Sequence, residues 1–251
     1  MTTTTLQYQT VALEHIQMVL DTQTERIEQA TEILTDAIAA GGIIQAFGTG
    51  HSRAVTLELA GRAGGLAAVG MLAVKDLVLF GDTSPEQILD PTFERESGIA
   101  ARIYELARPQ PNDAFVIVSN SGINSAIVEM AVLARSKGHP IVAITSLKHN
   151  AQVATRDASG SNLADLADVV IDNAAPAGDA TIDLGSGIRI GAVSNLTGIV
   201  IAQMLAEGIT RRLLEQGGEA PVFVSANLPD GDEHNRALYT AFGSRVRPIE
   251  P

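Results

Sequence analysis

Hydrophobic positions recur with two different periods along the chain. From Leu6 to Ala40 the apolar side chains are spaced three and four residues apart, which predicts one or two amphipathic helices. Gly41 and Gly42 end this pattern. Beyond them, short runs rich in β-branched residues alternate with longer helical stretches. Five of these runs have the length and composition of buried strands, at residues 42–48, 113–119, 140–146, 167–172 and 221–227.

This alternation predicts an α/β fold. We expect a three-layer αβα sandwich with a five-stranded parallel sheet, preceded by N-terminal helices over residues 1–40. The segment Val74–Arg108 combines turn signals with a helical pattern and is expected to be an insertion that forms a lid or a wall. A small hairpin is expected around residues 181–191, and a long apolar helix from Ala192 to about Gln216. Because no linker, repeat or low-complexity segment interrupts the chain, residues 1–251 are expected to form a single domain.

Composition and charge exclude several kinds of partner. The formal net charge is −12 and the basic residues form no dense cluster, so no nucleic acid is expected as a partner. No apolar run approaches the roughly 20 residues of a membrane span, and the first residues lack the pattern of a secretory signal. With no cysteine in the sequence, these features predict a cytoplasmic protein without a membrane partner.

Candidate binding residues follow the predicted strands. Ligands of open parallel sheets bind outside the carboxyl ends of the strands. The first strand leads into Gly48-Thr49-Gly50-His51-Ser52, where glycines let the backbone approach an anion and Ser52 lies at a helix N-terminus. The next two strands end in loops rich in hydroxyl and amide groups: Ser119, Asn120, Ser121, Gly122, Asn124, Thr145 and Ser146.

The glycine loop of residues 48–52 points to a phosphate, but not to a nucleotide. A dinucleotide fingerprint would need a third glycine where Arg53 stands, and no acidic residue follows in the next strand-like run to bind a ribose. The sequence also lacks the Gly-Lys-Ser or Gly-Lys-Thr of a triphosphate loop. A tight turn capped by a serine would explain this loop alone. Because two further hydroxyl-rich loops accompany it, we predict a single phosphate held by several hydroxyls.

With these loops, the sequence resembles the sugar isomerase (SIS) domain family of phosphosugar-binding proteins, and within it the phosphoheptose isomerase-like branch. The resemblance extends from the N-terminal helices to "VFVSANLPDGDEHNRAL". It implies a flavodoxin-like fold, a sugar phosphate as ligand, and homodimers or homotetramers with shared active sites. It also implies that hydroxyls surround the phosphate and that glycines leave it room: Ser52, Ser119, Ser121, Thr145 or Ser146, Gly48, Gly50 and Gly122.

Isomerisation of a phosphosugar needs an acid and a base. Glu58 lies two helical turns after His51, on the same face, so it could reach a sugar bound at the loop; its alternative is an ion pair with Arg62. His234 follows the last predicted strand and is a candidate for a sugar contact or proton transfer across a subunit boundary. A helix start capped by Asp232 explains its acidic neighbours but not the histidine. His51 could contact the ring oxygen or make a structural hydrogen bond.

A second carboxylate candidate lies in the insertion. The stretch "ERESGIA" resembles the Glu-Gly-Ala stretch that supplies a catalytic carboxylate in N-acetylmuramic acid 6-phosphate etherases, another SIS branch, which makes Glu96 a candidate. Its alternative is a solvated helix face. Without cysteines, and without a His-x-x-x-His or Asp-x-Asp ligand pattern, we expect no metal and no cofactor.

Three functions fit this sequence. The first is an aldose–ketose isomerase of a phosphorylated sugar, with Glu58 and His234 as its acid–base pair. The second is a lyase of the etherase type, with Glu58 and Glu96. The third is a sensor that binds a phosphosugar without converting it. We prefer them in this order. The sensor comes third because the known SIS regulators carry a DNA-binding region ahead of the SIS domain, and only some 40 residues precede the first predicted strand here.

Overall fold

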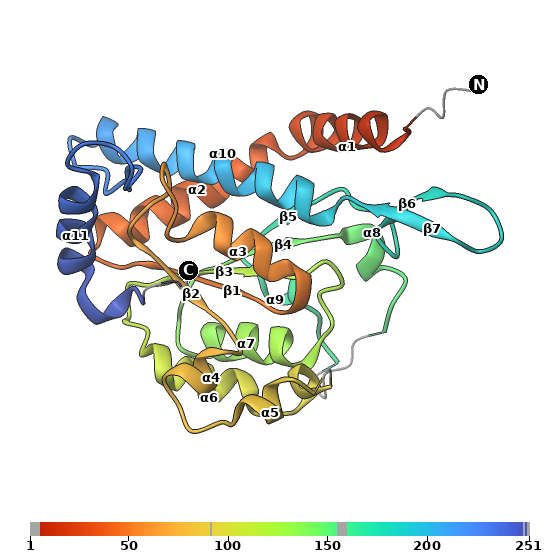
Figure 1. The fold of residues 1–251 in the computed structure, drawn as a ribbon, viewed down its shortest axis with the longest axis horizontal. Helices are drawn as coiled ribbons and strands as arrows, with labels where there is room; N and C mark the ends of the chain where they lie inside the picture. The colour runs from red at the N-terminus through yellow and green to blue at the C-terminus, as the bar shows by residue number, and fades with distance from the viewer. Residues whose placement is uncertain (1–5, 91, 155–159, 248, 250–251) are drawn as a thin grey trace.

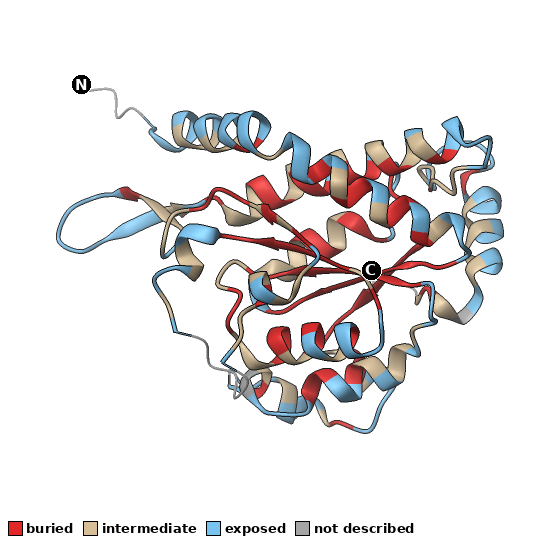
Figure 2. Ribbon diagram, turned by 180° about the vertical axis from the view of Figure 1, so that it is seen from behind, coloured by how far each residue is buried: buried red, intermediate tan, exposed pale blue. Residues whose placement is uncertain are grey.

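The computed structural model describes residues 6–90, 92–154, 160–247 and 249. Its centre is a parallel five-stranded sheet with the order β2-β1-β3-β4-β5 (Figure 1). The strands are β1 Ile44–Gly48, β2 Val69–Leu72, β3 Ala114–Val118, β4 Ile141–Thr145 and β5 Val169–Asp172. Every residue of β1 to β4 is buried (Figure 2), as expected of parallel strands that helices cover on both faces.

Helices cover the two faces of the sheet. One face is covered by four of them: α1 Tyr8–Thr22, α2 Thr24–Ala39, α3 Arg53–Leu59 and α10 Ser194–Glu215. The other face is covered by five helices: α4 Asp76–Leu79, α5 Pro85–Ile88, α6 Ile99–Ala107, α7 Ser125–Ser136 and α9 Leu163–Leu166. Side chains alternate between the two cores along β3, because successive residues of a strand point to opposite faces. The predicted three-layer sandwich is confirmed.

Three predicted elements are found close to their expected positions. The N-terminal pattern forms α1 and α2, and the long apolar helix is α10. The expected hairpin consists of β6 Ala180–Asp183 and β7 Arg189–Ala192, which pair antiparallel. Within the described part of the chain, no helix has both the length and the apolar character that crossing a membrane requires.

The fifth strand was predicted at the wrong place. Residues 221–227 form no strand; an isolated bridge between Leu66 and Val222, with backbone hydrogen bonds beside it, joins them to the segment before β2. Their apolar character serves a local contact, since the ring of Phe223 packs on Tyr239 with centroids 4.9 Å apart. The fifth strand is β2, whose four residues include a glycine and therefore give a weak strand signal.

The strand order determines where a ligand can bind. β1 pairs with β2 on one side and with β3 on the other, so the loops after β1 and β3 leave the sheet side by side. In flavodoxin-like sheets of this order, ligands bind at the carboxyl ends of these two central strands. The predicted insertion at residues 74–108 follows β2 and contains α4, α5, the short 3-10 helix η2 (Phe93–Arg95) and α6.

Candidate functional site

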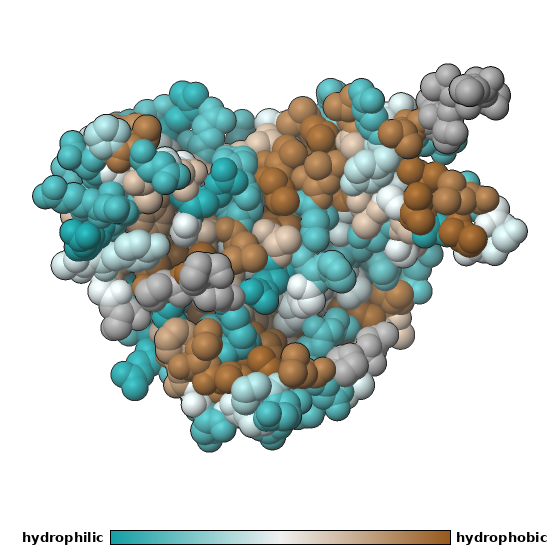
Figure 3. All heavy atoms as spheres, viewed as in Figure 1, coloured by the Kyte–Doolittle hydropathy of each residue, from teal (hydrophilic) through white to brown (hydrophobic). Residues whose placement is uncertain are grey.

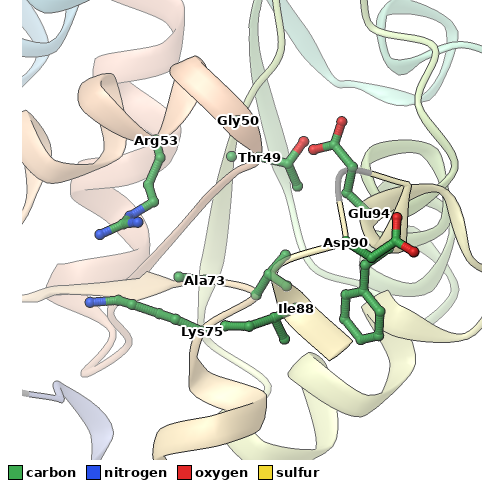
Figure 4. A pocket seen from close by; sticks show the side chains of 11 residues that line it. Thr49, Gly50, Arg53, Ala73, Lys75, Ile88, Asp90 and Glu94 are labelled. Carbon is green, nitrogen blue, oxygen red and sulfur yellow. The ribbon is translucent and has the colours of Figure 1, made fainter. Parts of the chain in front are cut away.

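A cavity of about 380 Å³ opens at the carboxyl ends of β1 and β2 (Figure 4). Its volume is typical of sites for small molecules. The loop after β1, the loop after β2 and the insertion supply its walls: Gly48, Thr49, Gly50, Arg53, Ala73, Val74, Lys75, Ile88, Asp90, Phe93 and Glu94. Part of the insertion thus forms one wall of this cavity.

The charged residues of the cavity are separated by sign. Figure 4 shows the ends of Arg53 and Lys75 together on one side, and the carboxylates of Asp90 and Glu94 on the other. Burial and the positive charge of Arg53 lower the pKa of Lys75, while the neighbouring Asp76 partly opposes this shift. The ammonium group of Lys75 therefore lies where a further negative charge would stabilise it.

The loop after β3 is built around Gly122. The hydroxyl oxygen of Ser119, which is buried, accepts a hydrogen bond from the N–H of Gly122 at 3.0 Å. Gly122 has a φ of +67°, and a Cβ atom here would lie 2.8 Å from Oδ1 of Asn150. The backbone conformation therefore favours glycine, and any larger residue would also displace the amide of Asn150.

Helix α7 begins directly after this loop, and no side chain caps its N-terminus. The side-chain amide of Asn124 instead donates to Oε1 of Glu94 at 3.3 Å, which connects the β3 loop to the wall of the cavity. N–H groups in the first turn of a helix have no partner within the helix and are well placed to bind an anion.

The hydroxyls of Thr145 and Ser146 make hydrogen bonds within the protein. Both residues are buried. Thr145 Oγ1 accepts a hydrogen bond from the amide of Asn150 at 2.8 Å. Ser146 Oγ donates to the carbonyl oxygen of Ala175 at 2.6 Å and caps α8 (Leu147–Asn150). These two residues hold together the loops that follow β4 and β5.

The other predicted binding residues surround the same end of the sheet. Gly48 and Gly50 line the cavity, and Gly50 has a φ of +54°. His51, which is exposed, and Ser52, which is half-buried, belong to the short 3-10 helix η1 (Gly50–Ser52). In the β3 loop, Ser121 is half-buried. The neighbouring Asn120 accepts a hydrogen bond from the amide of Asn173 at 3.1 Å.

The three catalytic candidates do not meet within one chain. Glu58 forms an ion pair with Arg62 and accepts a hydrogen bond from Gln203 of α10 at 2.6 Å. Glu96 is exposed, directly after η2. His234 lies on α11 (Gly231–Phe242), with Nε2 hydrogen-bonded to the carbonyl oxygen of Val222 at 2.9 Å.

The position of Val222 places His234 at the other end of the sheet. Residues 222 and 223 pair with residues 64–66, which precede β2, so they lie near the amino ends of the strands. The cavity opens at the carboxyl ends. None of the three catalytic candidates is among the described residues that line it.

Four charged residues of the cavity were not predicted as site residues. Lys75 follows β2, whose strand signal is weak, and lies in the segment Val74–Arg108, which was predicted as a lid or wall without a binding residue in it. Arg53 was interpreted only as a departure from a glycine pattern. Asp90 and Glu94 lie in the insertion, and the sequence pattern does not indicate which of its residues face the cavity. Among the described residues, no group of three or more His, Asp or Glu side chains could hold a metal ion.

Comparison with known proteins identifies the family. The family profile described as "SIS domain" matches residues 7–146, more than half of the chain, and the chain therefore belongs to the SIS domain family of phosphosugar-binding proteins. It is 36% identical over 225 residues to the UPF0309 protein BH3325 of Halalkalibacterium halodurans, which covers 89% of this chain and 91% of that protein. It is 34% identical over 229 residues to the UPF0309 protein lmo0025 of Listeria monocytogenes, covering 90% and 91%.

Solved structures share the fold at low sequence identity. The phosphoheptose isomerase GmhA from Neisseria gonorrhoeae has a TM-score of 0.53 and 15% identity, covering 80% of this chain and 94% of that one. The Vibrio vulnificus NanR protein complexed with ManNAc-6P has a TM-score of 0.51 and 14% identity, covering 94% and 68%. At these identities the likeness concerns the fold alone.

Proposed function

We propose that this protein binds a phosphorylated sugar between the loops after β1 and β3 and interconverts its aldose and ketose forms. One observation carries the proposal. The β3 loop ends in a helix of 12 residues without a side-chain cap, and Asn124 of this loop is hydrogen-bonded to the wall of a cavity large enough for a small molecule. The phosphate would bind at the loop and helix, and the sugar would lie in the cavity.

The proposed phosphate site uses the hydroxyls of the two central loops. Ser121 and Ser52, both half-buried, would donate to the phosphate together with the first N–H groups of α7. Ser119, Thr145 and Ser146 would act mainly by holding the loops in shape, because their oxygens are already hydrogen-bonded within the protein. The solved relative GmhA, a phosphoheptose isomerase by name, supports a reaction of this class.

Proton transfer between C1 and C2 of the sugar requires a base beside these carbons. Glu94 is a half-buried carboxylate on the cavity wall, and Figure 4 shows its side chain facing Thr49 of the β1 loop. We propose Glu94 as this base. The earlier pair, Glu58 and His234, remains a proposal for an assembly in which a second copy of the chain brings them to the site.

The reaction is tested by proton NMR in heavy water with a panel of hexose, heptose and N-acetylated sugar 6-phosphates. We expect exchange of the C2 proton and new ketose or aldose signals for at least one sugar. Glu94→Gln should reduce the exchange rate by about a hundredfold or more while the sugar still binds. Glu105→Gln, an exposed carboxylate on α6, is the matched control. An unchanged rate in Glu94→Gln would assign the base elsewhere, and no exchange with any sugar would contradict the isomerase.

Sensing without turnover is the second candidate function. It is favoured by the separation of Glu58, Glu96 and His234 from the cavity within one chain. The NanR protein, which shares the fold, is described in complex with ManNAc-6P, so binding of a sugar phosphate by a protein of this fold is compatible with this function. Tight binding of a sugar phosphate, without exchange at any carbon, would favour this function. A lyase of the etherase type would instead release a C3 substituent in the same spectra, and unaltered turnover in Glu96→Gln would exclude it.

A further inference from the structure

The side of the cavity next to β2 carries two positive charges that the proposed phosphate site does not use. Arg53 begins α3 after the β1 loop, and Lys75 follows β2. Their ends lie together in Figure 4, and the charge of Arg53 is one of the causes that lower the pKa of Lys75. Two cations facing the same cavity repel one another, so an anion bound between them would be favoured over a neutral group.

This cation pair lies at some distance from the β3 loop. In the sheet, β1 separates β2 from β3, so the loops after β2 and β3 start two strand spacings apart, about 10 Å. This separation is comparable with the length of a phosphorylated hexose. A phosphate at the β3 loop would therefore leave the opposite end of the sugar near Lys75.

We propose that the sugar phosphate bound here carries a second anionic group, a carboxylate or a second phosphate, and that Arg53 and Lys75 bind this group. The inference rests on the proposed phosphate site and is independent of the reaction that follows. Asp90 and Glu94 on the opposite wall would face sugar hydroxyls.

The net charge of the protein makes this local arrangement necessary. At −12 the chain repels anions at long range, so a ligand with two anionic groups must gain its affinity from contacts inside the site. A carboxylate or phosphate can accept charge-assisted hydrogen bonds from the guanidinium of Arg53 and the ammonium of Lys75 at the same time. A sugar with a hydroxyl at that position would gain much less affinity from the two cations.

The test compares matched sugar phosphates by calorimetric titration of the full chain. Three pairs differ by one anionic group: glucose 6-phosphate and 6-phosphogluconate, N-acetylglucosamine 6-phosphate and N-acetylmuramic acid 6-phosphate, and fructose 6-phosphate and fructose 1,6-bisphosphate. We expect the more acidic member of at least one pair to bind about tenfold or more tightly. The first two pairs report on a carboxylate and the third on a second phosphate.

Variants assign the preference to the cation pair. Lys75→Met should remove the difference in affinity between the two sugars of a pair and leave the affinity for the less acidic sugar unchanged. Lys148→Met, at an exposed lysine of α8, should change the affinity for neither sugar. Equal affinities within all three pairs of the unaltered protein would overturn the inference, and so would equal weakening of both members by Lys75→Met, which would assign Lys75 to the first phosphate. If none of the six sugars binds, the proposed phosphosugar site itself fails, and the inference with it.

Discussion

At the residue scale, the conformation of the loop after β3 depends on a single glycine. Gly122→Ala would place a side chain on a residue with a φ of +67° and a Cβ atom 2.8 Å from Oδ1 of Asn150. We expect the backbone strain to cost about 1–2 kcal/mol and the contact with Asn150 to add to it. Urea unfolding would measure the loss of stability, and calorimetric titration with a sugar phosphate would measure the expected loss of affinity.

Gly138→Ala is the matched control for this substitution. Gly138 follows α7, has a φ of +82°, and a Cβ atom at this position would meet no heavy atom within 4 Å. This variant therefore experiences the backbone strain without the close contact. Equal losses of stability in the two variants, with unchanged sugar binding in both, would contradict the special role of Gly122.

Part of the candidate site could be predicted because its residues follow strands with a clear sequence pattern. Gly48, Gly50 and the Ser119–Asn124 loop follow strands that the sequence marks strongly, and the carboxyl ends of parallel strands meet at one edge. Lys75 and Glu94 reach the cavity through the path of the insertion, which depends on tertiary packing. The ion pair of Glu58 with Arg62, in contrast, follows directly from their four-residue spacing.

At the scale of elements, the edge strand β2 is covered by the C-terminal segment. This segment starts with η3 (Gly243–Arg245), and Val246 packs with Ile43 and Ala68. Arg245 donates to the carbonyl oxygen of Gly41 at 3.0 Å and forms an ion pair with Asp113, which is fully buried. This contact ties the end of the chain to the start of β3.

Arg245→Met should therefore destabilise the fold strongly. It leaves the carboxylate of Asp113 buried without its cation, although backbone and amide N–H groups of Ile43, Gln45 and Gln110 still donate to it. We expect a loss of about 3 kcal/mol, near the lower end of the range for breaking a buried pair. The free energy of unfolding in urea measures this loss.

An exposed ion pair provides the comparison. Arg211→Met removes the partner of Glu207 on α10, where both side chains are largely exposed, and should change stability by less than about 0.5 kcal/mol. If Arg245→Met were equally mild, the C-terminal segment would not stabilise the sheet edge in the way we infer.

Strand β2 also marks the limit of prediction for elements. Its sequence, Val69-Gly-Met-Leu, is short, and it becomes a strand because it pairs with β1, while the backbone of Arg245 in the C-terminal segment approaches Gly70 closely. Residues 221–227 have a stronger strand pattern but lie beyond the sheet edge, where Asn235 donates to and accepts from the backbone of Val224. Local propensity was overridden in both cases by tertiary contacts.

At the scale of the whole molecule, large apolar side chains are exposed on two neighbouring elements. The hairpin β6–β7 and its turn expose Leu184, Ile188 and Ile190, and α1 exposes Leu13. Figure 3 shows brown atoms gathered over the hairpin at the right of the view. The hydroxyl of Tyr8 donates to the carbonyl oxygen of Ala192 at 2.8 Å, so the helix and the hairpin are held together as one surface.

An apolar surface of this kind favours self-association, because its burial removes it from water. We expect the protein to be a homodimer or homotetramer in solution, with the hairpin at the interface. Light scattering coupled to size-exclusion chromatography would measure the mass. Replacing Leu184 and Ile188 by aspartate should raise the dissociation constant by about a hundredfold or more, since each large side chain contributes about 1.5–3 kcal/mol when buried.

Leu228→Asp is the control for this double replacement. Leu228 is as exposed as the hairpin residues but lies in the loop before α11, at the other end of the sheet. Its replacement should leave the mass of the assembly unchanged. A monomeric mass for the unaltered protein at tens of micromolar would refute the expected assembly, and an unchanged mass in the double variant would move the interface away from the hairpin. If the hairpin forms the interface, the NMR exchange assay can be repeated on the double variant to test whether a second copy contributes to the site. We expect turnover to be lost together with the assembly if Glu58 or His234 acts across the interface.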